Sequence, residues 1–325
     1  MTEMTVLDVG HGNSAILRSA GQVAVIDAPT RSLLLDTLRD MDIETVDAAF
    51  ISHADKDHLA GIVGLLTSTT VRVNTLYLNV DANRRSRLWR DFLAAVAVAQ
   101  AKGRCHVVTS LSSTTPSRVD IGDARIHVVA PSASLTLTGV GGRTKDDQLV
   151  TANTLSAVLR IEHEEDGDGV LLAGDMDKIG LKDALASGAD LGARVLVFPH
   201  HGGSPGSDVD SFTREVLEAV KPSTVIFSNG RNRHDNPQPA IVEATLAHGC
   251  SLACTQMSRN CSAEPVSGDH LEDVRAQGRK DDLCCAGSIT LDLGGGARRR
   301  PDHEARFGSF VASAVSTPMC RQRLN

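Results

Sequence analysis

The sequence predicts an α+β protein with layered sheets and helices on their outer faces. Short apolar runs of strand length open the chain, and segments with helical periodicity are interleaved with the later runs. The chain has 325 residues, enough for one large domain, and its 41% hydrophobic and 22% charged residues are ordinary globular values. This composition excludes bulk disorder and a fibrous repeat.

The predicted strands are rich in Val and Ile and are bounded by Gly, Asp or Pro. They cover residues 5–9, 15–18, 23–26, 48–51, 75–80, 106–108, 125–129, 155–161, 170–173, 195–198, 224–228 and 288–293. The predicted helices cover residues 33–41, 58–66, 88–101, 211–220 and 240–248. Two stretches rich in Ser, Thr, Gly or charge, 110–118 and 136–148, predict surface loops.

Charge and aromatic content exclude some functions. The net charge is −7, and the chain has one Trp, one Tyr and seven Phe. The negative charge disfavours a protein that coats a polyanion. The small number of aromatic residues disfavours a protein that stacks bases on aromatic platforms. No apolar run approaches the roughly 18 residues of a membrane span, and no signal pattern is found at the start. We therefore expect a cytoplasmic protein without a membrane partner.

The segment 51–61 carries the strongest chemical signal. It places His53, Asp55, Asp57 and His58 within six residues, after a predicted strand and at the start of a predicted helix. Carboxylates held so close raise one another's pKa and repel each other, and a divalent cation removes that cost. The segment therefore predicts a metal site. The alternative is a solvated acidic turn that happens to contain two histidines.

The spacing His-x-Asp-x-Asp-His after a strand resembles the metallo-β-lactamase superfamily, whose usual form is His-x-His-x-Asp-His. Two further segments, LDVGHGNS at 7–14 and FPHHGG at 198–203, occur in the matching order. Together they resemble the C-terminal domain of ComEC-type DNA-uptake proteins, and also phosphorylcholine esterases. The resemblance covers about residues 4–254 and implies a four-layer αββα sandwich, with two divalent ions bound at one edge between the sheets.

The resemblance also implies the ligands of the two ions, Zn²⁺ or Mn²⁺. They are His53 and Asp55 for the first ion, Asp57 and His58 for the second, Asp175 bridging both, and His201 closing the second site. His200 would then face the substrate, although the residues alone leave open which of the two neighbouring histidines is the ligand. Asp27, which ends a strand, would orient a ligand from behind.

Two departures from the family pattern concern the first ion. Asp55 stands where relatives have a His, and Asn153 stands where many have another His. The first site is therefore richer in oxygen, which shifts its preference from Zn²⁺ toward Mn²⁺ or Mg²⁺. The alternative is that this site is degenerate and only one ion binds.

Two weaker sets complete the candidate residues. Asn232 and His234 follow a predicted strand and are candidate substrate contacts, with a solvated loop as the alternative. Six of the seven cysteines lie in the last quarter, and Cys254, Cys261 and Cys284 are candidate ligands of an additional structural Zn²⁺. The alternative is a set of half-buried thiols.

The predicted organisation is a hydrolase domain over residues 1–255, a cysteine-rich insertion and final strand packed on it over 256–295, and a flexible tail over 296–325. The predicted function is a metal-dependent hydrolase, most specifically a phosphodiesterase or nuclease acting on a nucleic acid or nucleotide. In this hypothesis a metal-bridged hydroxide attacks phosphorus, Asp57 and Asp175 orient it, and His200 assists the leaving oxygen.

Two other functions stay open on the sequence. One is a non-catalytic metal-binding sensor or a partner protein in a multiprotein system. The other is a hydrolase of a different ester or amide. The sequence identifies no protein partner.

Overall fold

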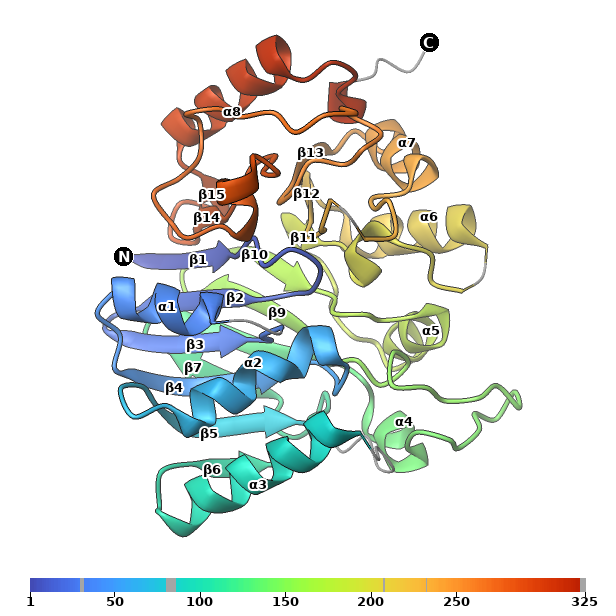
Figure 1. The fold of residues 1–325 in the computed structure, drawn as a ribbon. Helices are drawn as coiled ribbons and strands as arrows, with labels where there is room; N and C mark the ends of the chain where they lie inside the picture. Colours follow the sequence, from blue (N-terminus) through green and yellow to red (C-terminus); the bar gives the residue numbers. More distant parts are fainter. Residues whose placement is uncertain (30–31, 80–85, 207, 232, 322–325) are drawn as a thin grey trace.

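Two sheets face each other in the computed structural model, which describes residues 1–325 apart from 30–31, 80–85, 207, 232 and 322–325 (Figure 1). The strand order of the first described sheet is β15-β14-β1-β2-β3-β4-β5-β6, and that of the second is β13-β12-β11-β10-β9-β8-β7. Strands β3 to β6 are parallel, and so are β10 to β13. The carboxyl ends of each parallel set therefore lie along one edge of its sheet.

The strands of the first sheet are β1 (Thr2–Val6), β2 (Ala15–Ser19), β3 (Gln22–Ile26), β4 (Thr45–Ile51), β5 (Arg72–Leu78), β6 (His106–Val108), β14 (Ile289–Asp292) and β15 (Arg298–Arg299). Those of the second are β7 (Arg118–Ile121), β8 (Ala124–Ala130), β9 (Val158–His163), β10 (Asp166–Leu172), β11 (Val195–Val197), β12 (Thr224–Phe227) and β13 (Ser251–Cys254).

The α-helices are α1 (Leu33–Asp40), α2 (Lys56–Thr67), α3 (Arg87–Ala101), α4 (Ala133–Thr138), α5 (Lys178–Ala186), α6 (Val209–Val220), α7 (Pro239–Ala247) and α8 (Pro301–Ala314). Short 3₁₀ turns are η1 (Pro199–Gly202), η2 (Gln277–Asp281) and η3 (Met319–Arg321).

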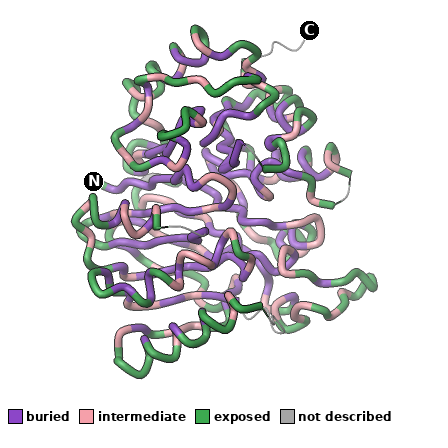
Figure 2. Tube along the Cα trace, in the orientation of Figure 1, coloured by how far each residue is buried: buried purple, intermediate pink, exposed green. Residues whose placement is uncertain are grey.

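The strands are apolar on both faces because both faces are buried. In β3, Ala24 and Ile26 point into the core between the sheets, whereas Val23 and Val25 point into a second core under α1, α2 and α3. A third core lies between the outer face of the second sheet and α5, α6 and α7. Figure 2 shows this burial along the strands, with exposed residues on the outer helices. These layers confirm the predicted αββα sandwich.

Every predicted strand and helix overlaps an observed one, although residue 80 of the strand predicted at 75–80 lies outside the described residues. Helices α4, α5 and α8 were not predicted. Helix α4 has only six residues, and α5 and α8 each contain an interior glycine, Gly180 or Gly308, which lowers intrinsic helix propensity by about 1 kcal/mol relative to alanine. Packing on the cores stabilises these helices despite that weak local signal.

The structure differs from the predicted flexible tail over residues 296–325. Residues 301–314 form α8, and Phe307, Phe310 and Val311 are buried in the core between the sheets. Phe310 also stacks on His270, with ring centroids 3.7 Å apart. The apolar spacing i, i+3, i+4 gives the helix one buried face, and this face orders the segment.

No described helix combines the length and the apolar character that crossing a membrane requires.

We expect Phe310→Ala to lower the free energy of unfolding by about 3–5 kcal/mol, because it removes a buried aromatic ring and leaves a cavity. Urea denaturation measures this change. Leu137→Ala in α4 is the control, since Leu137 is 87% exposed and its loss should change stability by less than about 0.5 kcal/mol. Equal midpoints for the two variants would show that α8 does not stabilise the core.

Candidate metal centre

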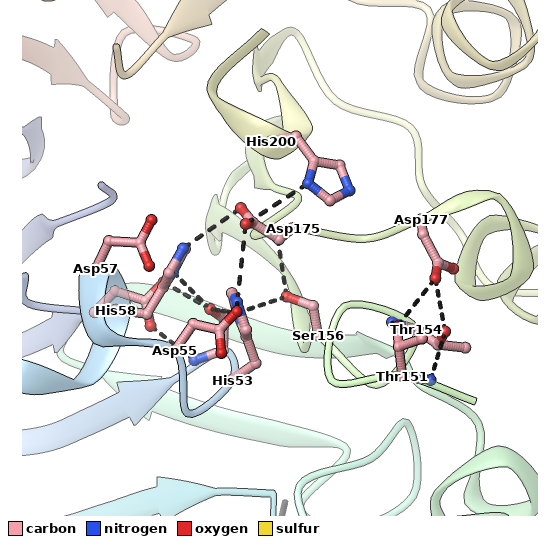
Figure 3. Close-up of polar contacts among 12 residues, drawn as sticks. His53, Asp55, Asp57, His58, Thr151, Thr154, Ser156, Asp175, Asp177 and His200 are labelled. Carbon is pink, nitrogen blue, oxygen red and sulfur yellow. Dashed lines mark hydrogen bonds and ion pairs between the residues drawn. The ribbon is translucent and has the colours of Figure 1, made fainter. Parts of the chain in front are cut away.

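Histidines and carboxylates converge where strands of both sheets end (Figure 3). The turn after β4 supplies His53, Asp55, Asp57 and His58, and Asp175 follows β10. His200 and His201 follow β11 in η1. A backbone hydrogen bond joins the two sheets here, because the Ala157 N–H donates to the Ser52 carbonyl at 2.8 Å. All six predicted metal ligands therefore lie in one cluster.

Asp175 is at the centre of this cluster. Its Oδ1 lies 3.4 Å from His58 Nε2 and 3.6 Å from His201 Nε2. Its Oδ2 lies 3.6 Å from His200 Nδ1 and 3.8 Å from His53 Nε2. The carboxylate thus faces imidazoles from two different segments of the chain, the β4–α2 junction and η1.

The donor set fits divalent ions. The Nε2 atoms of His53, His58 and His201 and Oδ1 of Asp175 are buried without a hydrogen-bond partner. Separations of 3.4–3.8 Å between these nitrogens and the carboxylates are too long for good hydrogen bonds. Two ligands of one tetrahedral ion lie about 3.3–3.5 Å apart, given metal–ligand distances near 2.1 Å. A bound cation would therefore satisfy the atoms that lack partners.

The described residues contain two groups of donor atoms, and the atoms within each group lie within 4.8 Å of one another. One group is His53, His58 and Asp175, and the other is His11, Asp57 and His201. Asp55 adjoins the first group, with its Oδ2 3.4 Å from His53 Nε2. His58 Nε2 also adjoins the second group, because it faces the same Asp175 oxygen, Oδ1, as His201 Nε2.

Asp27 contacts the cluster from behind, through Ser52 and His58. Its carboxylate accepts hydrogen bonds from the Ser52 backbone N–H at 2.7 Å, from the Ser52 hydroxyl at 2.7 Å and from His58 Nδ1 at 2.8 Å. A histidine that donates its Nδ1–H to a carboxylate presents a lone pair at Nε2, which is the form that binds a metal. Asp27 therefore sets both the tautomer and the orientation of His58.

Ser52 and Ser156 are functional positions that the sequence analysis missed. The Ser52 hydroxyl lies 3.2 Å from His53 Nδ1, and the Ser156 hydroxyl lies 3.4 Å from the same atom. Ser156 Oγ also accepts the Asp175 N–H at 3.0 Å. The sequence gives no signal that Ser156 contacts Asp175, because the two residues lie next to different strands and meet only in the folded chain.

The backbone of η1 is strained in a way that places both histidines. His200 and His201 have φ values of 53° and 57°, in the left-handed region. This region costs a non-glycine residue roughly 1–2 kcal/mol. Gly202 follows with φ 79°, and a Cβ there would come within 2.7 Å of Phe227 and Pro237. The strained turn directs two consecutive imidazoles toward Asp175 and is retained at a functional site.

Neighbouring charges shift the pKa values of Asp175 and His58 in the direction opposite to the effect of burial. Burial alone opposes ionisation of Asp175, yet the imidazoles of His58 and His201 hold its pKa well below the ordinary value. Burial likewise opposes protonation of His58, but Asp27 and Asp175 raise its pKa well above the ordinary value. Burial lowers the pKa of His200. Asp175 and His58 thus stabilise each other's charged forms.

His11 is the clearest residue that the sequence analysis missed. Its Nε2 lies 3.4 Å from Asp57 Oδ2. Burial, reinforced by His201, lowers the pKa of His11 to about 4. The segment 7–14 belongs to the candidate site because it occurs in the matching order with the other motifs. No local sequence pattern indicated which of its side chains reaches the cluster.

The remaining predicted residues that the structure describes lie in turns after or before strands. Asn153 is half-buried in the turn that precedes β9. His234 is exposed at the border, with its ring 5.0 Å from that of His11. Asn232 lies outside the described residues.

The three predicted zinc-binding cysteines do not form a ligand group either. Cys254, Cys261 and Cys284 are free thiols, and the candidate metal groups among the described residues contain no cysteine. Cys284 Sγ instead donates to Asp8 Oδ2 at 3.2 Å. Burial raises the pKa of all three thiols. This arrangement corresponds to the alternative of half-buried thiols.

The two facing sheets, their outer helices and the ligand-bearing strand ends decide the fold. The chain has the metallo-β-lactamase fold. No family model matches it. It is similar to ComE operon protein 3 of Bacillus subtilis (strain 168), with 23% identity over 280 residues that cover 79% of this chain and 32% of the relative. The chain thus spans about a third of that relative's length.

Solved structures with the metallo-β-lactamase fold are also similar. The metallo-β-lactamase fold protein YhfI from Bacillus subtilis has 13% identity and a TM-score of 0.47, over 79% of this chain and 98% of that one. A metallo hydrolase from Ignicoccus hospitalis has 14% identity and a TM-score of 0.45, over 78% and 95%.

We expect Asp27→Asn to weaken binding of a divalent ion by about 10–100-fold, because His58 loses the carboxylate that orients it. Calorimetric titration of the metal-free protein with Zn²⁺ or Mn²⁺ measures this. Asp120→Asn is the matched control, since Asp120 is an exposed aspartate of β7 paired with Arg118. Affinity in Asp27→Asn within twofold of the control would contradict the role assigned to Asp27.

Proposed function

We propose that this chain is a metal-dependent phosphodiesterase that acts on nucleotides or short single-stranded nucleic acid. The observation that carries the proposal is the cluster of histidines and carboxylates whose facing atoms lack hydrogen-bond partners. His53, Asp55, His58, Asp57, His201 and Asp175 would hold two divalent ions. When bound, such ions supply Lewis-acid activation of a water molecule and of a phosphoryl oxygen.

The side chains supply the remaining chemistry. Asp57 is partly exposed, so one carboxylate oxygen can accept a hydrogen bond from an attacking water and orient it. His200 presents a buried Nε2 without a partner, while its Nδ1 faces Asp175. As a neutral imidazole, His200 can donate an Nε2–H hydrogen bond to the leaving oxygen. The negative charge that develops on that oxygen makes this hydrogen bond stronger in the transition state.

A cavity beside the centre supports the substrate class. Its volume is about 660 Å³, and its wall includes His11, Asp57, Lys56, Arg233 and Gln277. Ligand pockets for small molecules span roughly 300–1,000 Å³, so a nucleotide fits this volume. Lys56 and Arg233 offer positive charge for phosphate oxygens. The net charge of −7 opposes tight binding of a duplex, which favours a small or single-stranded substrate.

We expect Mn²⁺-stimulated cleavage of bis-p-nitrophenyl phosphate, lost with a chelator and restored by added metal. Asp57→Ala should lower kcat by about 10²–10⁴-fold, because it removes a ligand and the group that orients water. The appearance of p-nitrophenol measures both. Asp120→Ala should keep full activity. A protein that binds metal but cleaves no ester in this assay would instead be a metal-binding sensor or a hydrolase of another bond.

Arg233 should affect substrate binding more than chemistry. We expect Arg233→Gln to raise KM for a dinucleotide by about 10-fold, because a charge-assisted hydrogen bond to phosphate contributes roughly 1.5–3 kcal/mol. Its kcat for bis-p-nitrophenyl phosphate, a reporter too small to need the far cavity wall, should change less than twofold. Steady-state kinetics with both substrates separate these effects. An unchanged KM for the dinucleotide would remove Arg233 from the substrate site.

A further inference from the structure

We propose that a cavity between the edges of the two sheets binds the phosphate group of a small phosphorylated molecule. The cavity has a volume of about 340 Å³. Its wall includes residues of β13, at the end of the second described sheet, and of β14 and β15, at the end of the first. Figure 1 shows these strands together below α8. The inference goes beyond the proposed function and does not rest on it.

The cavity lies at the opposite end of the strands from the metal centre. Arg194 precedes β11, Thr224 begins β12 and Ser251 begins β13, and all three belong to the cavity wall. The histidines of the metal centre instead follow β11, in η1. Because β11, β12 and β13 are parallel, their amino ends lie along one edge of the sheet and their carboxyl ends along the other. The two sites therefore share no side chain.

The cavity combines an apolar floor with a polar wall. Ile226, Ala253 and Leu291 line it and are buried in the core between the sheets. Pro301 and Glu304, from the first turn of α8, also line it. Ligand pockets for small molecules span roughly 300–1,000 Å³ and are built in this way. A volume near the lower limit suits a molecule of the size of a sugar phosphate.

Positive charge gathers in this wall, although the whole chain carries a net charge of −7. Its described charged residues are three arginines, Arg194, Arg298 and Arg299, and one carboxylate, Glu304. Within the described part of the chain, the exposed Arg298 side chain has neither an ion pair nor a hydrogen bond. Arg194 pairs through Nη1 with Asp168 at 2.9 Å, which leaves its other N–H groups for a ligand. Guanidinium groups suit phosphate because they can donate two parallel hydrogen bonds to it.

The guanidinium of Arg299 lacks good partners. Its side chain is only 5% exposed, and its Nη atoms lie 3.4 Å from Glu272 Oε1 and 3.3 Å from Glu304 Oε2. Both separations exceed the roughly 2.7–2.9 Å of strong charge-assisted hydrogen bonds. Its Nε is buried without a hydrogen-bond partner among the described residues. A phosphate group at this wall would add negative charge beside a buried cation that is incompletely paired.

Hydroxyl groups of the wall suit the sugar part of a sugar phosphate. The Ser251 hydroxyl donates to the Ser223 carbonyl at 3.1 Å and lies 2.9 Å from the Thr224 hydroxyl, which therefore donates to Ser251. The Thr224 oxygen keeps its lone pairs, so it can accept a hydrogen bond from a sugar hydroxyl. We therefore expect ribose 5-phosphate to bind more tightly than inorganic phosphate.

Calorimetric titration of the full chain with inorganic phosphate and with ribose 5-phosphate tests the proposal. We expect Arg298→Gln to weaken binding by about 10-fold or more, because it removes a charge-assisted hydrogen bond. Arg298→Lys, which keeps the positive charge, should weaken binding less. Arg233→Gln is the matched control, since it makes the same substitution in the cavity beside the metal centre. It should leave this binding unchanged.

Hydrogen exchange followed by mass spectrometry locates the bound phosphate. We expect slower exchange in residues 192–197 and 296–304 of the unmodified chain, and no such change in Arg298→Gln. Thermal unfolding shows whether each variant folds. Tighter binding of ribose 5-phosphate would identify a sugar phosphate as the ligand, and equal affinities would identify phosphate itself. The proposal is overturned if neither compound binds, if folded Arg298→Gln binds as the unmodified chain does, or if only Arg233→Gln weakens binding.

Discussion

The buried carboxylate of Asp175, facing imidazoles from both sheets without a hydrogen bond to them, is the interaction on which the centre depends. Burial of such charges is costly unless they are paired or bound to a metal. The facing atoms lie 3.4–3.8 Å apart, which leaves room for cations between them. The surrounding structure therefore holds a buried carboxylate and several imidazoles at distances that leave room for cations between them.

The two-sheet architecture makes this convergence possible. The carboxyl ends of β3 and β4 in one sheet meet those of β10 and β11 in the other. Asp27 and His53 follow the first pair, whereas Asp175 and His201 follow the second. Because apolar cores lie on both sides of each sheet, the strand ends are rigid, and the polar residues can occupy the turns without destabilising the layers.

The segment after β13 contributes to the same region. Gln256 and Gly278 hydrogen-bond Asp8, which anchors the turn of His11, and Gln277 lines the cavity next to the centre. The free thiol of Cys284 donates to the same carboxylate. The cysteine-rich part of the chain thus supports the metal-site turn through hydrogen bonds, and β14 completes its attachment by pairing with β1.

The sequence by itself determined the layers and most of the candidate ligands. Apolar runs of strand length and helical spacing are local signals, and the cluster from His53 to His58 is contiguous. Asp175 and His201 were found through the order of their motifs. Only the tertiary structure decided the places of His11, Ser156 and α8 and the hydrogen bond of Cys284 to Asp8. These positions depend on contacts between distant segments, and a single sequence carries no local pattern for such contacts.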